Sequence, residues 1–223
     1  MNRSEINRNL ARAMQVLELY HWRLPEWGYW SPKDFAREPT LADFLRDHQL
    51  GWDVTDFGSG DFARKGLVLF SLRNGLMGVP SERTYAEKLL LVGEGQETPA
   101  HLHRSKMEDI INRGGGTLVV EFSRADGVGG ELEGPVTVAV DGRLVELEQW
   151  VSLDLLPGQS VTIVPGVYHR FYGKPGHGVV LAGEVSQVND DHTDNYFLEP
   201  TGRFAQIIED EIPLYPLWNE VSG

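Results

Sequence analysis

Three histidines and one glutamate stand at spacings that suit a single metal site. His101 and His103 are separated by one residue, and residues two apart on a β-strand point to the same face. Glu108 follows after an expected bend, and His169 follows the turn Pro165-Gly166, which could bring a second strand alongside. Three imidazoles and one carboxylate suit Mn²⁺, Fe²⁺, Co²⁺, Ni²⁺ or Zn²⁺. We therefore predict one divalent cation, with coordination positions left open for a substrate to chelate.

The glycines around these residues strengthen this interpretation. A lone His-x-His pair in a strand is more often structural than metal-binding. Here the spacing resembles the first motif of the cupin superfamily, whose fixed positions are matched by Gly95, His101, His103, Glu108 and Gly115. The resemblance implies a small β-barrel with the ligands inside it.

The second cupin motif is matched only in part. Gly158, Pro165-Gly166 and His169 are present, but Pro165 is one residue late and Gly173 stands where the motif has asparagine. Since the spacing from Gly158 to His169 is kept, we expect His169 to remain a ligand and the turn to be built differently.

The remaining histidines have no such neighbours in the sequence. We interpret His21, His48 and His177 as ordinary surface or core residues, whereas His192 could touch a substrate.

The first part of the chain has helical patterns. Ser4 could cap a helix whose apolar residues recur at helical spacing, and Ser31-Pro32 with Asp34 is a second start signal. A third short helix is expected from Leu41 to His48. The aromatic segment 21–30 is expected to cover one open face of a barrel, although Trp27, Tyr29 and Trp30 could instead stack on a sugar.

From Gly66 onwards the pattern changes to short strands. Asp141-Gly142 is a strong hairpin signal, and regularly spaced short strands are typical of a sandwich or jelly roll. We predict a mainly β fold, a cupin jelly-roll barrel (66–188) with an N-terminal helical and aromatic segment (1–65) and a C-terminal segment that wraps back over it (189–223). The expected strands are Gly66 to Leu72, Ala86 to Val92, Thr117 to Phe122, Val136 to Val140, Leu144 to Leu147, Ser160 to Val164 and Gly178 to Val185.

The composition narrows the classes of partner. A formal net charge of −13 disfavours nucleic acid and anionic membranes. The absence of cysteine excludes disulfides, thiolate metal sites and cysteine nucleophiles. No signal-peptide pattern or long apolar run is present, so we expect a cytoplasmic protein.

Segments outside the metal motif resemble the D-lyxose isomerase family nearly from end to end. They are Asn2 to Asn7, Tyr29 to Asp34, the strand with Lys88, Thr98 to Asp109, and Asn189 to Asn195. The resemblance implies an aldose–ketose isomerase that converts D-lyxose to D-xylulose, and D-mannose to D-fructose. It also implies a preference for Mn²⁺ and a homodimer.

An isomerase of this kind needs groups that move a proton between C1 and C2 of the sugar. Lys88 would serve if it points into the barrel, and it would be irrelevant if it points out. Glu199 is our candidate for the catalytic carboxylate, with a surface position as the alternative. Candidates for substrate binding, any of which could simply be solvated, are Lys106, Asp190, Asp191, Asp194 and Arg203.

Three other functions are compatible with the ligand set. A phosphosugar isomerase would need a dense basic group, but the predicted strands contain only Lys88 and Arg170. An iron dioxygenase could use the same ligands and would require oxygen. A non-catalytic sugar-binding cupin would bind sugars without converting them. The sequence favours an unphosphorylated monosaccharide as the partner.

Overall fold

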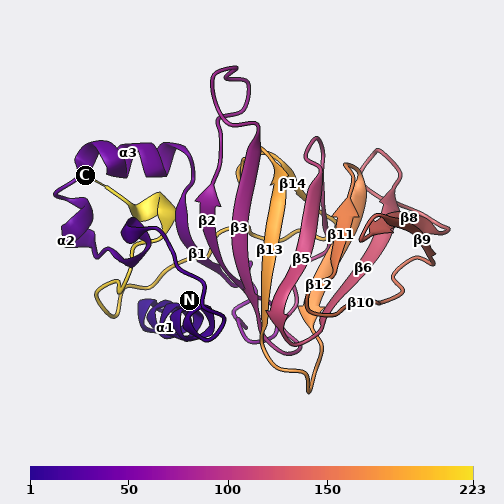
Figure 1. The fold of residues 1–223 in the computed structure, drawn as a ribbon, viewed down its shortest axis with the longest axis horizontal. Coiled ribbons are helices and arrows are strands. Elements are labelled where there is room, and N and C mark those ends of the chain that lie inside the picture. The colour runs from indigo at the N-terminus through magenta and orange to yellow at the C-terminus, as the bar shows by residue number, and fades with distance from the viewer. Residues whose placement is uncertain (223) are drawn as a thin grey trace.

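Two antiparallel β-sheets face each other and enclose a shared core (Figure 1). The computed structural model describes residues 1–222. The first sheet has the order β1-β2-β3-β13-β5-β11-β8-β9, and the second has the order β10-β6-β12-β4-β14, with β7 paired to β6. Both sheets contribute to the apolar core between them. The predicted fold class, a mainly β cupin barrel with N-terminal helices, is confirmed.

The strands of the first sheet are β1 Gly51–Thr55, β2 Leu67–Arg73, β3 Tyr85–Val92, β13 Val180–Gln187, β5 Glu108–Gly115, β11 Ser160–Ile163, β8 Val136–Val140 and β9 Arg143–Leu147. Those of the second sheet are β10 Leu153–Leu155, β6 Leu118–Ala125, β12 Val167–Gly173, β4 His101–His103, β14 Asn195–Phe197 and β7 Glu131–Leu132.

The predicted strands are all present, but β1, β5, β7, β10 and β14 were not predicted. Strand β5 has the buried polar residues Glu108 and Asn112 at positions that point into the barrel. Because inward positions of a strand are usually apolar, the sequence of β5 does not show the expected alternation of apolar and polar residues. Glu108 is the first residue of this strand and pairs with Ile163 and Ser186. It therefore lies inside the first sheet rather than in a loop.

The long neighbouring strands β3 and β13 are buried on both faces. Leu90 and Val92 of β3 point into the core between the sheets, whereas Leu89 and Leu91 point outwards into a second apolar cluster. That second cluster lies under helix α1 (Arg3–Leu19), which contributes Ile6 among other residues. Both faces are apolar because each has another layer packed on it.

The N-terminal helices lie beside the first sheet (Figure 1): α1, then the short helices η1 (Glu26–Tyr29), α2 (Pro32–Phe35) and α3 (Pro39–Asp47). Helix α1 begins at Arg3 after Asn2, so the prediction that Ser4 caps it is wrong. Ser4 instead donates a hydrogen bond from Oγ to Asp210. The helix start predicted at Ser31-Pro32 is confirmed, since α2 begins at Pro32 and Asp34 accepts hydrogen bonds from the backbone N–H and Oγ of Ser31.

The aromatic segment packs on the outer face of the first sheet. The ring of Trp27 stacks on Phe70 of β2 with centroids 5.1 Å apart, and Trp52 of β1 donates a hydrogen bond from Nε1 to the Gly28 carbonyl. Their position on the outer face removes Trp27 from the candidates for stacking on a sugar inside the barrel. The described residues contain no helix of the length and apolarity that a membrane crossing requires.

The C-terminal part of the chain contacts both the second sheet and the N-terminal helix α1. Strand β14 pairs with β4, so that Asn195 lies opposite His103. Further on, Ile208 pairs with Asn2, and the buried Arg3 forms ion pairs with Glu209 and with Glu220, which belongs to η2 (Trp218–Glu220). The C-terminal segment is thus tied both to the barrel interior and to helix α1.

Candidate metal and sugar site

Strands from both sheets bring the predicted metal ligands together. His101 and His103 lie on β4 and point to the same side, and His169 on β12 stands directly opposite His101 in the ladder. One ligand atom from each of these imidazoles lies within 4.8 Å of the other two. His169 is 0% exposed and His103 is 5% exposed. The three histidines therefore form a cluster that could hold a metal ion.

Backbone carbonyls orient two of the imidazoles. Nδ1 of His101 is 2.8 Å from the Pro99 carbonyl, and Nδ1 of His169 is 3.2 Å from the Val167 carbonyl. When Nδ1–H donates to a carbonyl, Nε2 is left as the unprotonated ligand atom, an arrangement typical of metal-bound histidine. Burial and the neighbouring imidazoles hold the pKa of His101 well below its usual range, so the ring is neutral and able to bind a metal.

For the third imidazole, that of His103, the carboxylate of Asp194 lies next to Nδ1, where the other two rings have a backbone carbonyl. Nδ1 of His103 lies 3.1 Å from Oδ2 of Asp194, which is an ion-pair contact, since neither atom has a hydrogen-bond partner within residues 1–222. The other oxygen of Asp194 accepts a hydrogen bond from Ser105 Oγ. Asp194 therefore acts on the ring of His103 and is not itself part of the cavity lining.

Glu108 completes the cluster. Its two oxygens lie 3.0 Å from Nε2 of His169 and 3.2 Å from Nε2 of His103. Within residues 1–222, neither Glu108 Oε1 nor His169 Nε2 has a hydrogen-bond partner. Burial raises the pKa of Glu108, but Lys106 and His103 more than offset this and hold it well below its ordinary value. An ionised oxygen and an imidazole nitrogen that converge without a hydrogen bond fit a shared cation.

Glu108 is the first member of a continuous series of buried ion pairs, which we call the ion-pair chain. Each contact is 2.7 to 3.7 Å long, and positive and negative groups alternate along it. The order is Glu108, Lys106, Glu184, Lys88, Asp191, Arg203 and Asp53. Buried charges are tolerated only when they are paired, and this alternation pairs every member.

Lys88 and Glu184 occupy the centre of this chain. They stand directly opposite each other on β3 and β13, with Nζ of Lys88 3.6 Å from Oε1 of Glu184. Lys88 points into the barrel and is 5% exposed, as its catalytic interpretation requires. Glu184 was missed by the sequence analysis, although it carries the same signal as Lys88, a charge within an otherwise apolar strand.

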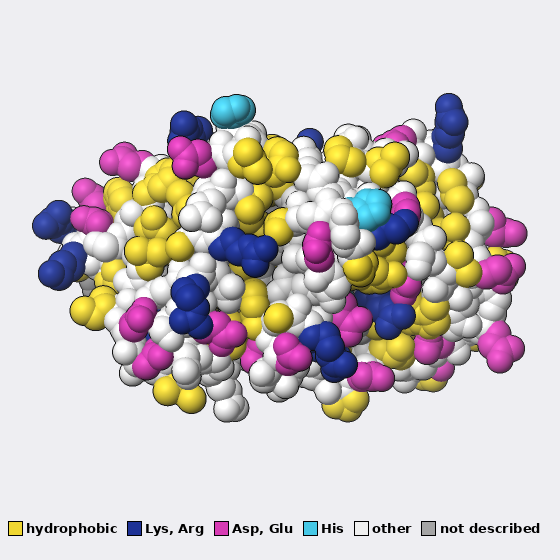
Figure 2. Space-filling view, turned by 90° about the horizontal axis from the view of Figure 1, so that it is seen from below, with side chains coloured by type: hydrophobic (Ala, Val, Ile, Leu, Met, Phe, Trp, Pro, Cys, Tyr) yellow, Lys and Arg dark blue, Asp and Glu magenta, His cyan; other side chains and the backbone are white. Residues whose placement is uncertain are grey.

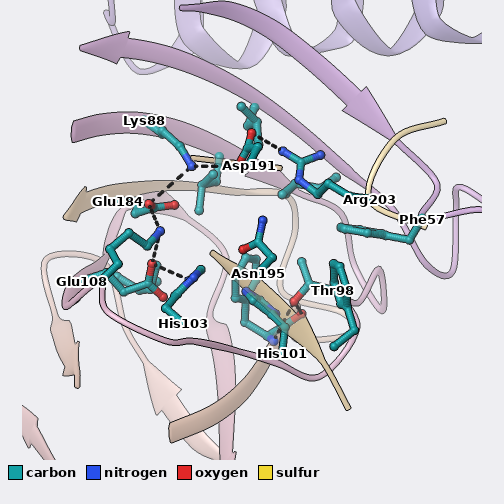
Figure 3. A pocket seen from close by; sticks show the side chains of 17 residues that line it. Phe57, Lys88, Thr98, His101, His103, Glu108, Glu184, Asp191, Asn195 and Arg203 are labelled. Atoms are coloured by element: carbon teal, nitrogen blue, oxygen red, sulfur yellow. Dashed lines mark hydrogen bonds and ion pairs between the residues drawn. The ribbon is translucent and has the colours of Figure 1, made fainter. Parts of the chain in front are cut away.

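The ion-pair chain from Glu108 to Arg203 lines one cavity together with His101 and His103 (Figure 3). Lys88, Asp191 and Arg203 lie across the cavity from His101 and His103. The rest of the wall is mostly apolar and is formed by Phe57, Leu67, Leu69, Leu90, Ile110, Phe171 and Phe197, together with Thr98 and Asn195. A cavity with both apolar and hydrogen-bonding walls suits a small polyol.

Of the predicted substrate residues, Lys106, Asp191 and Arg203 line this cavity. Asp190 does not, because its carboxylate accepts hydrogen bonds from Gln49, Thr193 and the backbone of His192. The ring of His192 packs near Phe204 and Trp218 outside the cavity.

Glu199 lies in the wrong place for the role predicted for it. It is exposed and lines a separate surface groove beside Pro99, Trp150 and Arg170. The residue follows β14, whose short ladder with β4 carries the chain past the cavity before Glu199 is reached. Its carboxylate therefore cannot be the group that faces a substrate next to the histidines.

Comparison with known proteins identifies the family of this chain. The family model described as D-lyxose isomerase matches residues 1–221. A D-lyxose/D-mannose isomerase from Serratia proteamaculans is 46% identical over 224 residues, covering 99% of this chain and 97% of the relative. A D-lyxose/D-mannose isomerase from Escherichia coli O157:H7 is 44% identical, covering 99% of this chain and 98% of the relative.

Solved structures of lower identity share the fold. L-ribose isomerase from Acinetobacter sp. DL28, in complex with L-ribose, superposes with a TM-score of 0.62 at 16% identity, covering 93% of this chain and 98% of the other. The enzyme from Cellulomonas parahominis gives 0.61 at 17% identity with the same coverage. The family match spans nearly the whole chain and both relatives are aligned almost from end to end. The chain therefore belongs to the D-lyxose isomerase family.

Proposed function

We propose that this protein interconverts D-lyxose with D-xylulose, and D-mannose with D-fructose, using one divalent cation bound by His101, His103, Glu108 and His169. The observation that carries the proposal is the convergence of the three imidazoles with Glu108, beside a cavity that the Lys88–Glu184 pair also lines. Family membership and the names of the two relatives support the same aldose–ketose reaction.

The chemistry divides between the cation and the protein. The cation, when bound, polarises the sugar carbonyl and stabilises developing negative charge on its oxygen. We assign the proton transfer between C1 and C2 to the carboxylate of Glu184, in place of Glu199. Glu184 is buried at the cavity wall and is held between Lys106 and Lys88. Burial raises its pKa, but the two lysines more than offset this and keep it below its ordinary value.

This ionised state suits a general base, because the carboxylate is ready to accept the proton removed from the sugar. Returning that proton to the neighbouring carbon, together with transfer of the hydroxyl proton from O2 to O1, completes the isomerisation through a cis-enediol. Lys88 is placed to donate a hydrogen bond from Nζ and to hold Glu184 in position. Lys106 is paired with both Glu184 and Glu108, so it links the base to the proposed ligand shell.

An unphosphorylated sugar fits this cavity better than a phosphosugar. Every cation in its lining, namely Lys88, Lys106 and Arg203, is already paired with a carboxylate. A phosphate would have to compete with those carboxylates for the same donors. On the face seen in Figure 2, acidic and basic side chains are interspersed and form no continuous basic patch.

We also propose that Mn²⁺ is the preferred ion and that the protein is a homodimer. Histidine and carboxylate ligands accept Mn²⁺ among several divalent ions. The dimer is supported by exposed apolar side chains near the β2–β3 connection and the adjoining strand ends, including Met77, Tyr85 and Val185. Light scattering on the purified protein measures the dimer directly. The cytoplasmic location stays a prediction.

The proposed function is tested by metal removal and addition. Protein stripped with EDTA should not convert D-lyxose or D-mannose, and added Mn²⁺ should restore formation of D-xylulose and D-fructose, measured by chromatography. Glucose 6-phosphate and D-ribose serve as comparison substrates. Binding of sugar without ketose formation would support a non-catalytic binding protein, and turnover that requires oxygen would support a dioxygenase. Either result would overturn the proposal.

A further inference from the structure

Asp53 is a charged residue in the middle of a fully buried strand. All five residues of β1 are buried, and Asp53 is 4% exposed. It is not part of the cavity lining and has no place in the proposed proton transfer. Burial of a carboxylate is costly unless a partner compensates for it, and burial raises the pKa of Asp53 although Arg203 opposes this. Because burying the carboxylate of Asp53 is costly, we expect its contacts to serve a function.

The partner of Asp53 is the guanidinium of Arg203. Nη2 of Arg203 lies 2.8 Å from Oδ2 of Asp53 and 2.7 Å from Oδ2 of Asp191. The contact with Asp191 is a hydrogen bond, whereas the contact with Asp53 is an ion pair, since Oδ2 of Asp53 has no hydrogen-bond partner within residues 1–222. Two residues along β1, on the same face as Asp53, Thr55 donates a hydrogen bond of 2.8 Å to the backbone carbonyl of Arg203. Strand β1 thus fixes both the backbone and the head group of this arginine.

One nitrogen of the guanidinium is left over. Within residues 1–222, the buried Nη1 of Arg203 has no hydrogen-bond partner. Arg203 is among the residues that line the cavity, and a buried N–H donor without a partner calls for an acceptor. The hydroxyl oxygens of a sugar are acceptors of the right kind.

The position of Arg203 in the cavity indicates which part of the sugar it would contact. Arg203 lies across the cavity from His101 and His103, with Asn195 between them (Figure 3). A sugar with its C1 and C2 oxygens near the histidines extends its other end towards Arg203. The guanidinium of Arg203 therefore lies near the end of the sugar that distinguishes one aldose from another by length and by terminal hydroxyl.

We infer that Asp53 is a positioning residue for substrate specificity, which holds Arg203 so that Nη1 donates a hydrogen bond to the terminal hydroxyl of the open-chain sugar. This inference rests on the proposed function. Asp191 cannot replace Asp53 in this role, because Asp191 is also engaged by Lys88 and by Asn189. Without Asp53 the guanidinium keeps one anchor, and its second nitrogen is no longer fixed in direction.

The test compares two sugars that differ only at the proposed contact. kcat and KM are measured for D-lyxose and for 5-deoxy-D-lyxose, which lacks the terminal hydroxyl, with the Mn²⁺-loaded wild type and Asp53→Asn. Wild type should prefer D-lyxose, and the variant should lose about tenfold or more of that preference, as for one hydrogen bond to a charged group. Most of the loss should appear in KM for D-lyxose. Comparing the ratios between the two proteins cancels the intrinsic difference in ring opening between the sugars.

Asp154→Asn is the matched control, because Asp154 is an exposed aspartate paired with Lys174 on the second sheet. It should keep the wild-type preference. If Asp53→Asn lowers kcat/KM equally for both sugars, or only lowers the melting temperature, the role is structural and the inference is overturned. If wild type converts neither D-lyxose nor D-mannose, the proposed function itself has failed, which is a distinguishable result.

Discussion

The two ends of the barrel interior are built from the same strands but have opposite chemistry. At one end, Val92 of β3 pairs with Val180 of β13, and both are completely buried. Four residues away in the same ladder, Lys88 pairs with Glu184. The second sheet repeats the contrast, because the apolar Leu118 stands opposite Gly173, whereas His169 lies further along the same strand β12.

The difference shows how one barrel can have a closely packed apolar end and a charged end that holds the site. The inward alternation of β3 and β13 is the same at both ends, and only the residue types change. Close packing at the apolar end stabilises the sheets and fixes their register. The register then places buried charges at fixed distances at the other end, where they are costly by themselves and acceptable as pairs.

The largest effect is expected from the ligands at the charged end. His169→Ala should abolish metal binding and lower kcat/KM by about 10³-fold or more, because the cation contributes several kcal/mol to the transition state. Metal content is measured by elemental analysis and turnover by ketose formation. His177→Ala, an exposed histidine bonded to Thr117, is the matched control. Retention of metal by His169→Ala would contradict the ligand assignment.

The next effect separates the two candidate carboxylates. Glu184→Gln should keep its metal and lose about 10²- to 10⁴-fold in kcat, since it removes the group that transfers the proton. Glu199→Gln should retain the kcat of wild type, because Glu199 lies outside the cavity. Solvent exchange at C2 of the sugar measures the same step independently. The opposite ranking of the two variants would restore the original prediction for Glu199.

A smaller effect, on stability, is expected at the apolar end. Leu118→Ala should lower the free energy of unfolding by about 2–5 kcal/mol, because it leaves a cavity in a fully buried site. Denaturant unfolding measures this loss, and kcat should stay close to that of wild type in the folded protein. A large fall in kcat with unchanged stability would show that the two ends are not divided in the way described above.

The smallest effect should come from the carboxylate behind His103. Asp194→Asn should weaken metal binding by about 10- to 100-fold, because Asp194 orients the imidazole. Competition with a chelating dye measures the affinity, and Asp154→Asn serves again as a surface control. Unchanged affinity would mean that the fold alone holds the ring of His103 in place.

Much of the site could be predicted from local patterns. The spacing of His101 and His103 on a strand, with the glycines around them, was enough to predict a cluster that could hold a metal. Lys88 was identified because a charge in an apolar strand stands out. Glu184 carries the same signal, a charge within an apolar strand, but was not predicted.

Errors arose where long-range pairing decides the position of a residue. Glu199 and Asp190 lie in the same C-terminal segment as Asp191 and Arg203, yet only the last two reach the cavity. The course of that segment depends on the pairing of β14 with β4 and on contacts with Gln49 and Thr55. No sequence pattern encodes such contacts, because the partners are more than 90 residues away.

The sequence by itself determined the fold class, the family and the histidine cluster, because each depends on residue types at short and fixed spacings. Only the tertiary structure decided which acids and bases meet in the cavity. It assembled the ion-pair chain from Asp53 to Glu108 out of β1, β3, β5, β13, the connection between β4 and β5, and the C-terminal segment. Such a chain depends on distances of a few ångströms between strands, which are fixed by sheet register and core packing and not by neighbours in the sequence.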